Sequence, residues 1–290
     1  MSTNPSEPIS SWSAGARRRI EQALAAALSP APPTEVARAA RYVALDGGHR
    51  WRGLLAVAAG FAFDPQAEAC AVPLAAAVEL MHAASLVLDD LPSMDNAATR
   101  RGKACVHLVF PEWAVDMLPP YLVHRAYHVV AGIEAAPAER RLRALRLLGD
   151  MGAALVRGQE LDLTAPAAPV AEAALLENYA LKSGSLFAGA LAAGALLCGA
   201  EEGEADALRE AGIRLGQAFQ ILDDVADGPE EDSDYKEAGR FTAYSLWGPD
   251  AARRRAMDLL ANARRLFDRL GSRADRIREV LAELQGPVAG

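Results

Sequence analysis

The chain has 290 residues and a formal net charge of −8, and 51% of its residues are hydrophobic although only 6% are aromatic. This length can bury one large core or two small ones, and the abundance of alanine and leucine favours closely packed helices over sheets. The acidic balance argues against a nucleic-acid partner, which requires a basic surface.

The predicted elements are helices, preceded by a short polar tail. Residues 1–11 form this tail, which is expected to be flexible, and Met1 to Ser13 lacks the apolar stretch of a signal peptide. Apolar residues at helical spacing predict helices at residues 14–28, 34–45, 54–63, 67–91, 113 onward, 138–163, 170–181, 184–198, 204–227, 251–270 and 273–284. No segment alternates with a period of two for long enough to predict a sheet. One all-α domain is therefore expected over residues 12–290, a bundle around central apolar helices.

Prolines and charged segments interrupt this helical pattern. Pro92 cannot easily continue the helix before it, and Pro119-Pro120 must break or bend the helix that starts at Trp113. Residues 97–104 are predicted to form a basic loop, and residues 228–239 an acidic one.

The apolar content predicts neither a membrane span nor a disulfide framework. The longest apolar run, Leu186 to Ala200, is short for a membrane span, and we expect a core helix there. Cys70, Cys105 and Cys198 lack the spacing of zinc ligands or of a disulfide scaffold. Free thiols in a reducing compartment are expected, and the predicted location is cytoplasmic.

Two groups of aspartates, each after an apolar helical run, carry the main functional prediction. They are Asp89, Asp90 and Asp95 in the first group and Asp223, Asp224 and Asp227 in the second. A buried carboxylate without a partner is costly to desolvate, and two such groups would repel each other across a cavity unless cations lay between them. Oxygen ligands suit Mg²⁺, with Mn²⁺ as an alternative, and Mg²⁺ also takes phosphate oxygens. The pattern therefore predicts a site that holds a polyphosphate ester through bridging metal ions.

Three basic segments accompany the aspartates. Arg100-Arg101-Gly102-Lys103 follows the first group at once, and guanidinium groups can pair with phosphate oxygens in a bidentate manner. Gly47 to Arg52 places further cations on a glycine turn, and Lys182-Ser183-Gly184 opens a helix whose N–H groups can meet phosphate. Each segment alone is typical of a solvated surface, so their combination with both aspartate groups carries the prediction.

The order of these motifs resembles that of the trans-isoprenyl diphosphate synthases, or polyprenyl synthetases, and bacterial geranylgeranyl diphosphate synthases most of all. Residues 79–102 resemble the first aspartate-rich motif of the family, and residues 216–227 resemble the second. Gly158 to Leu163 and Lys182 to Phe187 lie between them in the family's order. The resemblance covers roughly residues 42–248 and implies the isoprenoid-synthase helical bundle around a central apolar cavity.

This resemblance implies a magnesium-dependent, head-to-tail prenyl transfer. The allylic diphosphate ionises at the metal site, the double bond of isopentenyl diphosphate attacks the allylic cation, and a dry apolar cavity protects that cation from water. All six aspartates are expected metal ligands. The residues expected to act in catalysis are Asp89, Asp90, Asp223, Lys182 and Arg100.

The resemblance also implies which side chains hold the substrates. The allylic diphosphate would contact Arg100, Lys182 and Gln220, and isopentenyl diphosphate would contact Arg52, His82 and Arg101. The other expected substrate-binding residues are His49, Ala84, Ser183, Phe219 and Arg240. Two of these residues have an ordinary alternative, because a histidine or a phenylalanine at such positions can also be plain core packing. In the resembling family, a small residue at the position of Ala84 goes with C20 products and an aromatic residue with C15 products, so a C20 product is expected.

The chain departs from the family pattern around the diphosphates and not at the aspartates. His49 replaces a lysine, Gly53 a proline and Ser183 a threonine. The loop after Asp227 is short and lacks the first of two usual lysines, and Arg240 replaces the second. These changes would weaken both diphosphate sites, the isopentenyl site in particular.

Three other functions remain open. A terpene cyclase of the same fold would ionise an allylic diphosphate without adding an isopentenyl unit, and the loss of the lysine at His49 fits that pattern. A non-catalytic subunit of a partner synthase would not need intact aspartates, and a generic phosphohydrolase would not need long apolar helices. Those helices, at residues 67–91 and 113–130, and the family together predict a homodimer.

Overall fold

The computed structural model describes residues 9–29, 34–164, 171–237 and 242–285. Residues 1–8 of the expected tail and Arg240 lie outside the described residues. The first helix begins at Ile9, within the range expected to be tail. The all-α prediction is confirmed, and the helices are α1 (Ile9–Ala27), α2 (Glu35–Ala44), α3 (Trp51–Phe63), α4 (Glu68–Asp89), α5 (Val106–Val109), α6 (Glu112–Asp116), α7 (Leu118–Ala131), α8 (Ala138–Leu163), α9 (Glu172–Tyr179), α10 (Ser185–Leu197), α11 (Glu202–Glu237), α12 (Ala243–Trp247), α13 (Pro249–Asp268) and α14 (Asp275–Gln285).

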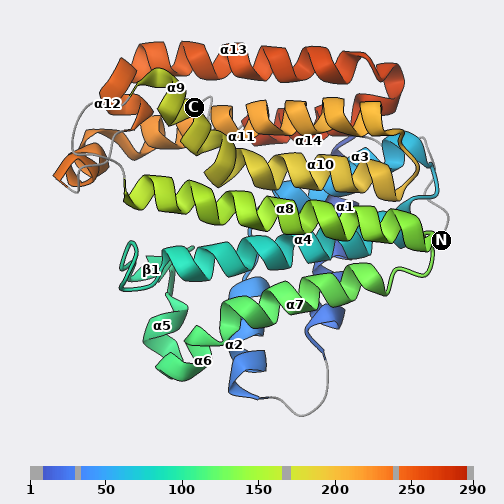
Figure 1. Ribbon diagram of the computed structural model, residues 1–290, viewed down its shortest axis with the longest axis horizontal. Coiled ribbons are helices and arrows are strands. Elements are labelled where there is room, and N and C mark those ends of the chain that lie inside the picture. The colour runs from blue at the N-terminus through green and yellow to red at the C-terminus, as the bar shows by residue number, and fades with distance from the viewer. Residues whose placement is uncertain (1–8, 30–33, 165–170, 238–241, 286–290) are drawn as a thin grey trace.

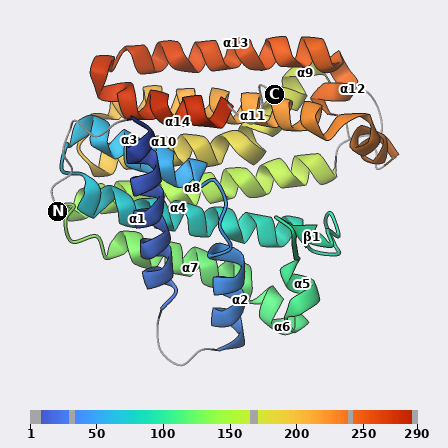
Figure 2. The same ribbon diagram turned by 180° about the vertical axis from the view of Figure 1, so that it is seen from behind.

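The long helices lie roughly side by side, and shorter elements gather at one end of the bundle. Figure 1 shows α13, α11, α10, α8, α4 and α7 as successive rows, and Figure 2 shows α1 crossing them from behind. Every residue of α10 is buried, and it packs against α3, α8 and α11. Glycines allow this close packing, since an added Cβ at Gly194 would lie 2.3 Å from the carbonyl oxygen of Ala56. The central helix therefore excludes water along its whole length.

Among the described residues, two helical stretches are long and apolar enough to cross a membrane, Glu68–Asp89 and Glu172–Leu197. However, 78% and 83% of the apolar 18-residue window in each stretch is buried inside the protein. Packing in the core accounts for their apolar character.

The structure corrects the sequence prediction at two connections. The basic loop contains a minimal antiparallel pair, β1 (Thr99–Arg100) and β2 (Lys103–Ala104), and strands of two residues are too short for an alternating pattern. The prediction of an acidic loop from residue 228 was wrong for residues 228–237, because the chain stays helical to Glu237 beyond a kink at Gly228 with φ of 76°. Pro229, which follows, suits the first turn of the resumed helix.

The proline pair acts as predicted. α6 ends at Asp116 and α7 begins at Leu118, with Pro119 and Pro120 in its first turn. Proline is tolerated there because the first N–H groups of a helix have no partner within it.

Candidate active site

A cavity of about 770 Å³ opens at the end of the bundle where α4 ends and the β1–β2 hairpin follows, and residues 219–226 of α11, just before the kink, also line it. It is lined by acidic, cationic and apolar side chains from α3, α4, α8, α10, α11 and the hairpin. Three of the six predicted aspartates line it, namely Asp89, Asp95 and Asp223. The two aspartate motifs, more than a hundred residues apart in sequence, thus face one space.

The geometry of α4 explains how the first motif reaches the cavity. His82, Ser85, Leu86 and Asp89 all line it, at the spacing of one helix face. The helix ends at Asp89, and a turn brings Asp95 back so that its N–H donates to the Asp89 carbonyl at 3.0 Å. Pro92 lies inside this turn, as expected from the sequence.

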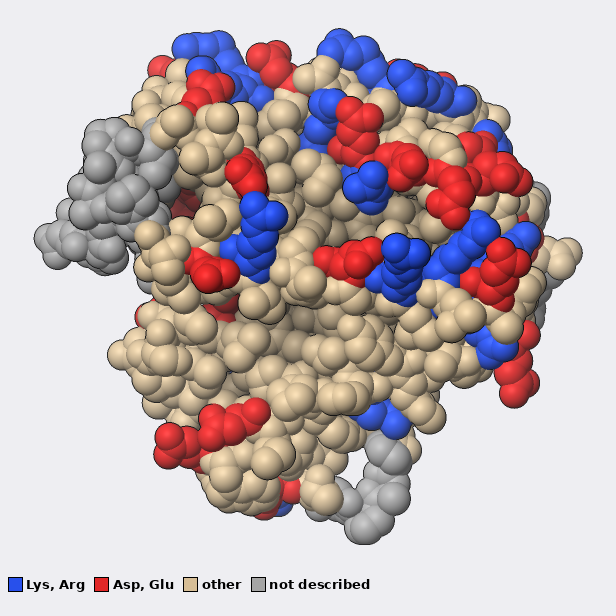
Figure 3. Space-filling view, in the orientation of Figure 1, with Lys and Arg blue, Asp and Glu red and all other residues tan. Residues whose placement is uncertain are grey.

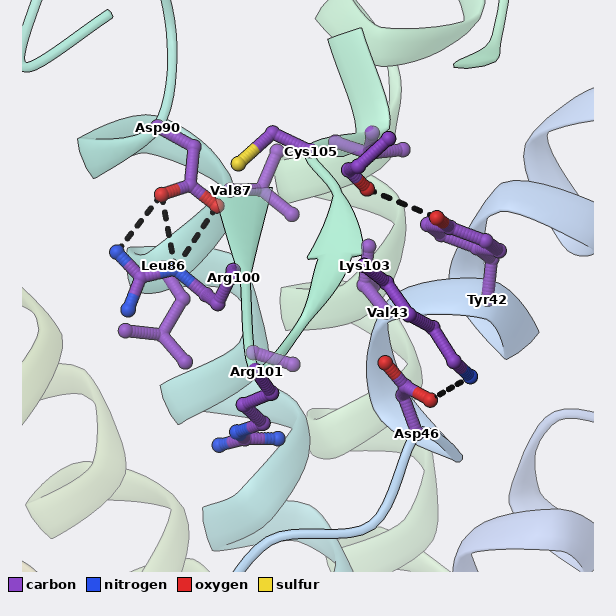
Figure 4. A pocket seen from close by; sticks show the side chains of 13 residues that line it. Tyr42, Val43, Asp46, Leu86, Val87, Asp90, Arg100, Arg101, Lys103 and Cys105 are labelled. Atoms are coloured by element: carbon purple, nitrogen blue, oxygen red, sulfur yellow. Dashed lines mark hydrogen bonds and ion pairs between the residues drawn. The ribbon is translucent and has the colours of Figure 1, made fainter. Parts of the chain in front are cut away.

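Asp90 and Asp224 do not line the cavity and are held by other side chains. Asp90 is buried and accepts hydrogen bonds from Arg100 Nε at 2.8 and 2.9 Å (Figure 4). Asp224 is buried as well; it accepts from the Tyr179 hydroxyl, from the N–H of Ala243 at 2.8 Å and from Gln220 Nε2 at 3.1 Å. These two carboxylates tie the hairpin to α4, and α11 to α9 and α12.

Asp227, the last of the six, is exposed and does not line the cavity. The structure therefore brings three of the aspartates together. The role of each aspartate as a metal ligand stays a prediction.

The acidic side chains of the cavity fit a cation that brings other ligands with it. Burial raises the pKa of Asp89 to about 6, with Asp95 adding to the shift and Lys182 opposing it. Within the described part of the chain, no three His, Cys, Asp or Glu side chains are close enough to enclose a metal by themselves. Carboxylates that offer only part of a coordination shell suit Mg²⁺, which usually keeps water and phosphate oxygens as ligands.

Arg52 and His82 lie side by side at the wall of the cavity. Arg52 Nη1 lies 3.1 Å from His82 Nε2, and the guanidinium lies 4.8 Å from the ring centre of Phe187. Burial lowers the pKa of Arg52 to about 10, opposed by Glu79 and Asp223. Burial and then the charge of Arg52 hold the pKa of His82 well below its ordinary value. His82 is thus a neutral partner of Arg52 at the cavity wall.

The hairpin delivers Arg100 and Arg101 to two different places. Arg100 lines the cavity while pairing with Asp90, and Arg101 donates to the Gly47 carbonyl at 3.0 Å. Figure 4 shows the Arg101 side chain pointing away from Asp90. Arg101 also has a positive φ of 52°, followed by Gly102 with φ of 77°, which forms the tight turn of the hairpin.

Lys182 and Ser183 lie on a π-helical turn, η1 (Ala180–Gly184), between α9 and α10. Lys182 Nζ pairs with Asp162 Oδ2 at 2.9 Å; burial alone would lower its pKa, but Asp162 and Asp89 raise it. Ser183 Oγ donates to Gln220 Oε1 at 2.7 Å. An added Cβ at Gly158 would lie 2.6 Å from the backbone nitrogen of Lys182, so a glycine is needed where α8 passes this turn. Such turns recur at functional sites.

The apolar part of the cavity is formed by Leu155, Leu186, Phe219 and Leu222. Phe219 contacts Phe187, with ring centres 5.8 Å apart. Ala84, the expected floor residue, is buried, but its neighbour Ser85 is the one that lines the cavity.

His49 is exposed and lines the rim of the cavity. Its ring stacks on Trp51, with centres 5.1 Å apart and planes at 13°. The cavity therefore brings together the predicted substrate-contacting residues within the described part of the chain, except Ala84, which is buried and does not line it. Arg240 lies outside the described residues.

Sequence reasoning missed four residues that shape the site. Asp162 pairs with Lys182, Tyr179 contacts Asp224, Glu79 accepts from Gly53, and Arg253 of α13 lines the cavity rim. Glu79 and Asp162 lie inside the motif segments that carry the resemblance, which was the available signal. Nothing in the sequence around Arg253 distinguishes it from its neighbours Arg254 and Arg255.

Comparisons with known proteins identify the family. A family profile described as polyprenyl synthetase matches residues 33–243. A probable farnesyl diphosphate synthase of Sinorhizobium fredii is 34% identical, with 93% of this chain and 85% of that protein covered. A geranylgeranyl diphosphate synthase of Rhodobacter capsulatus is 35% identical, with 85% of this chain and 87% of that protein covered.

Solved structures show the same fold. An FPP/GFPP synthase of Zymomonas mobilis has a TM-score of 0.84 and 31% identity, covering 94% of this chain and 96% of that one. A geranyltransferase of Legionella pneumophila has a TM-score of 0.86 and 26% identity, covering 97% of both chains. The chain belongs to the polyprenyl synthetase family of prenyltransferases, as the motifs predicted.

Proposed function

We propose that this chain condenses isopentenyl diphosphate head-to-tail with an allylic diphosphate, in a magnesium-dependent reaction with a C20 or C15 product. One observation carries the proposal: a single cavity joins Asp89, Asp95 and Asp223 to a cationic wall and an apolar wall. Relatives named farnesyl and geranylgeranyl diphosphate synthases support chain elongation.

The residues divide the chemistry between them. Asp89, Asp95 and Asp223 would hold Mg²⁺, or Mn²⁺, which when bound withdraws charge from the leaving diphosphate. Lys182 and Arg100 add positive charge on the same side, and preorganised charge of this kind stabilises the ionising C–O bond. The released diphosphate is the base that takes the last proton, so no protein base is required.

The second diphosphate belongs on the other cationic wall. Arg52, His82, Arg101 and His49 line the cavity there. Leu155, Leu186 and Phe219 exclude water from the allylic cation between the two walls. An aromatic face such as that of Phe219 also favours a nearby positive charge.

We further propose a cytoplasmic homodimer. Cys70, Cys105 and Cys198 are free and buried, which fits a reducing compartment. Several large apolar side chains are exposed on α5–α8 and their connections, and these are Leu108, Val109, Trp113, Met117, Leu142 and Val156. Figure 3 shows few charged side chains on the surface over α4 and α7. Apolar patches of this kind mark protein interfaces.

One assay tests the function. The purified protein is incubated with Mg²⁺, isopentenyl diphosphate and each allylic diphosphate in turn, and products are identified by mass. Elongated diphosphates support the proposal. Cyclised hydrocarbons or alcohols formed without consumption of isopentenyl diphosphate would replace it with the cyclase function, for which the exposed His49 is the structural argument.

A further inference from the structure

The turn between α2 and α3, which leads from Gly47 to the cationic wall, has an unfavourable backbone. Gly47, Gly48 and Arg50 have φ values of 72°, 107° and 55°. The left-handed region is costly for a residue with a side chain such as Arg50, so surrounding contacts must hold this turn in place. His49 lies inside the turn and Arg52 follows it, and both line the cavity.

Glu79 of α4 supplies the central contacts to this turn. Its side chain is 3% exposed. Oε1 accepts the N–H of Gly53 at 2.8 Å, and Oε2 lies 3.5 Å from Arg50 Nη1. Because α3 begins at Trp51, Gly53 carries one of the first N–H groups of the helix, which have no partner within it. Glu79 therefore caps α3 from a neighbouring helix and places a negative charge where the helix dipole favours it.

Other residues secure the same turn from further sides. Arg50 also pairs with Glu21 Oε1 at 2.7 Å and donates to the Ala44 carbonyl at 2.7 Å. Arg17 of α1 donates to the His49 carbonyl at 3.1 Å. Among these contacts, those of Glu79 connect the turn to α4, the helix that carries Asp89.

The positions of Glu79, His82 and Asp89 along α4 link the start of α3 to the first aspartate motif. Glu79 and His82 are three residues apart, on one face of the helix. Glu79 holds Gly53 and Arg50, while His82 contacts Arg52 at 3.1 Å. Asp89 follows two turns further along the same helix. The separation of the cationic wall from Asp89 is therefore set by where Glu79 and His82 hold the start of α3.

Gly53 makes this arrangement particular to the chain. An added Cβ at Gly53 would lie 3.1 Å from Glu79 Cγ and 3.3 Å from Ile20 Cδ1. The proline that the family pattern has at this position has no N–H to donate. Glycine supplies both the donor and the close approach.

We infer that Glu79 is a positioning residue for the second diphosphate, acting through Gly53 and Arg50 on Arg52 and His49. It does not bind substrate itself, because both carboxylate oxygens are engaged by the protein and a carboxylate would repel a diphosphate. The inference rests on the proposed function, since it assigns this wall to isopentenyl diphosphate.

Steady-state kinetics with each substrate varied separately test the inference. Glu79→Leu should raise the KM for isopentenyl diphosphate about tenfold, and the KM for the allylic diphosphate less than about twofold, the size expected when a charged hydrogen bond is lost. Glu79→Gln keeps an acceptor for the Gly53 N–H and should recover part of the loss. Gly53→Pro removes that donor and also brings ring atoms against Glu79 and Ile20, and it should raise the same KM.

Controls separate positioning from folding. Glu21→Gln removes the charge of the other carboxylate that pairs with Arg50 and leaves the Gly53 contact in place. It should change neither KM by more than about twofold. If Glu79→Leu does not fold, the KM values of Glu79→Gln and Gly53→Pro test the inference in its place. Equal changes in both KM values, or a lower melting temperature with unchanged KM values, would overturn the inference.

A failure of the proposed function can be distinguished from a failure of the inference about Glu79. If the wild-type protein makes no elongated product, the proposed function fails, and calorimetric titration of isopentenyl diphosphate into the same variants then tests Glu79. Binding weakened by Glu79→Leu supports the positioning role, and unchanged or undetectable wild-type binding overturns it.

Discussion

At the scale of single residues, the aspartates of each pair have different surroundings. Asp89 and Asp223 line the cavity, whereas Asp90 and Asp224 are buried among hydrogen-bond donors. Successive residues of a helix point about 100° apart, so two neighbouring side chains cannot serve the same space equally. In each pair, therefore, one aspartate lines the cavity and the other is held by hydrogen bonds from other parts of the protein.

This division predicts different effects of substitution. Asp89→Ala and Asp223→Ala should each lower kcat by at least about a hundredfold, because each removes a preorganised charge. Asp90→Ala should instead lower the melting temperature, because it leaves a partly buried Arg100 without its partner. Turnover and thermal unfolding of the purified variants check this, and near-normal turnover of Asp89→Ala would contradict the site.

The environment of Asp89 also predicts a pH effect on stability without metal. Burial raises its pKa from the ordinary value of 3.8 to about 6. Between pH 3.8 and about 6, the folded state therefore binds more protons than the unfolded state. Stability conferred by the protonated form is thus lost as pH rises through about 6. In the presence of a chelator, Asp89→Asn should raise the melting temperature at pH 7 and have little effect at pH 4. A variant less stable than wild type at pH 7 would contradict the desolvation argument.

His49 predicts a change in substrate affinity. It lies exposed on the rim of the cavity, where a lysine would carry a permanent charge. His49→Lys should lower the KM for isopentenyl diphosphate and leave the allylic KM nearly unchanged, as measured with each substrate varied in turn. No change in either value would mean that this position does not meet substrate, and would favour the cyclase function.

At the scale of elements, two buried methionines lie next to cavity residues of α4 and α8. One turn below the cavity residues Ser85 on α4 and Leu155 on α8 lie Met81 and Met151, both buried. An added Cβ at Gly152 would lie 3.1 Å from Met81 Cε, and one at Gly189 would lie 2.5 Å from Met151 Sδ. The two methionines thus occupy space next to the cavity residues that glycines of neighbouring helices leave open.

We expect the side chains around Met81 and Met151 to set the chain length of the product. Ala84→Phe should shift the product to C15, since a packed core has no spare volume for the ring, and Met151→Ala should lengthen the product. Leu148→Ala, also on α8 and fully buried, is the matched control that should lower stability and keep product length. Mass analysis of the products checks all three variants. An unchanged length in Ala84→Phe would remove the basis for a C20 product.

At the scale of the whole molecule, the exposed apolar surface predicts association. Trp113, Met117, Leu142 and Val156 are each more than half exposed, and exposed apolar side chains of this size favour a protein interface. We expect a homodimer by light scattering at micromolar concentration. Met117→Glu together with Val156→Glu should shift the mass towards the monomer, and a strictly monomeric wild-type protein would contradict the prediction.

The sequence by itself determined the fold class, most helix positions and the cavity-facing motifs, because these depend on local patterns. Apolar spacing marks each helix, and prolines mark their ends, as at Pro92 and Pro119. Two acidic motifs after apolar runs indicated a shared metal and phosphate site without any knowledge of how the helices pack.

Only the tertiary structure decided which of these residues face the cavity and which hold others. Asp90 accepts hydrogen bonds from Arg100, and Asp224 accepts them from Tyr179 and Ala243. Buried carboxylates are normally hydrogen-bonded in this way. Glu79 contacts Gly53 across two helices, a pairing that no local spacing encodes. The physical reason is that the spacing of apolar residues along the chain determines where helices form. Which residues distant in sequence become hydrogen-bond partners depends on how those helices pack.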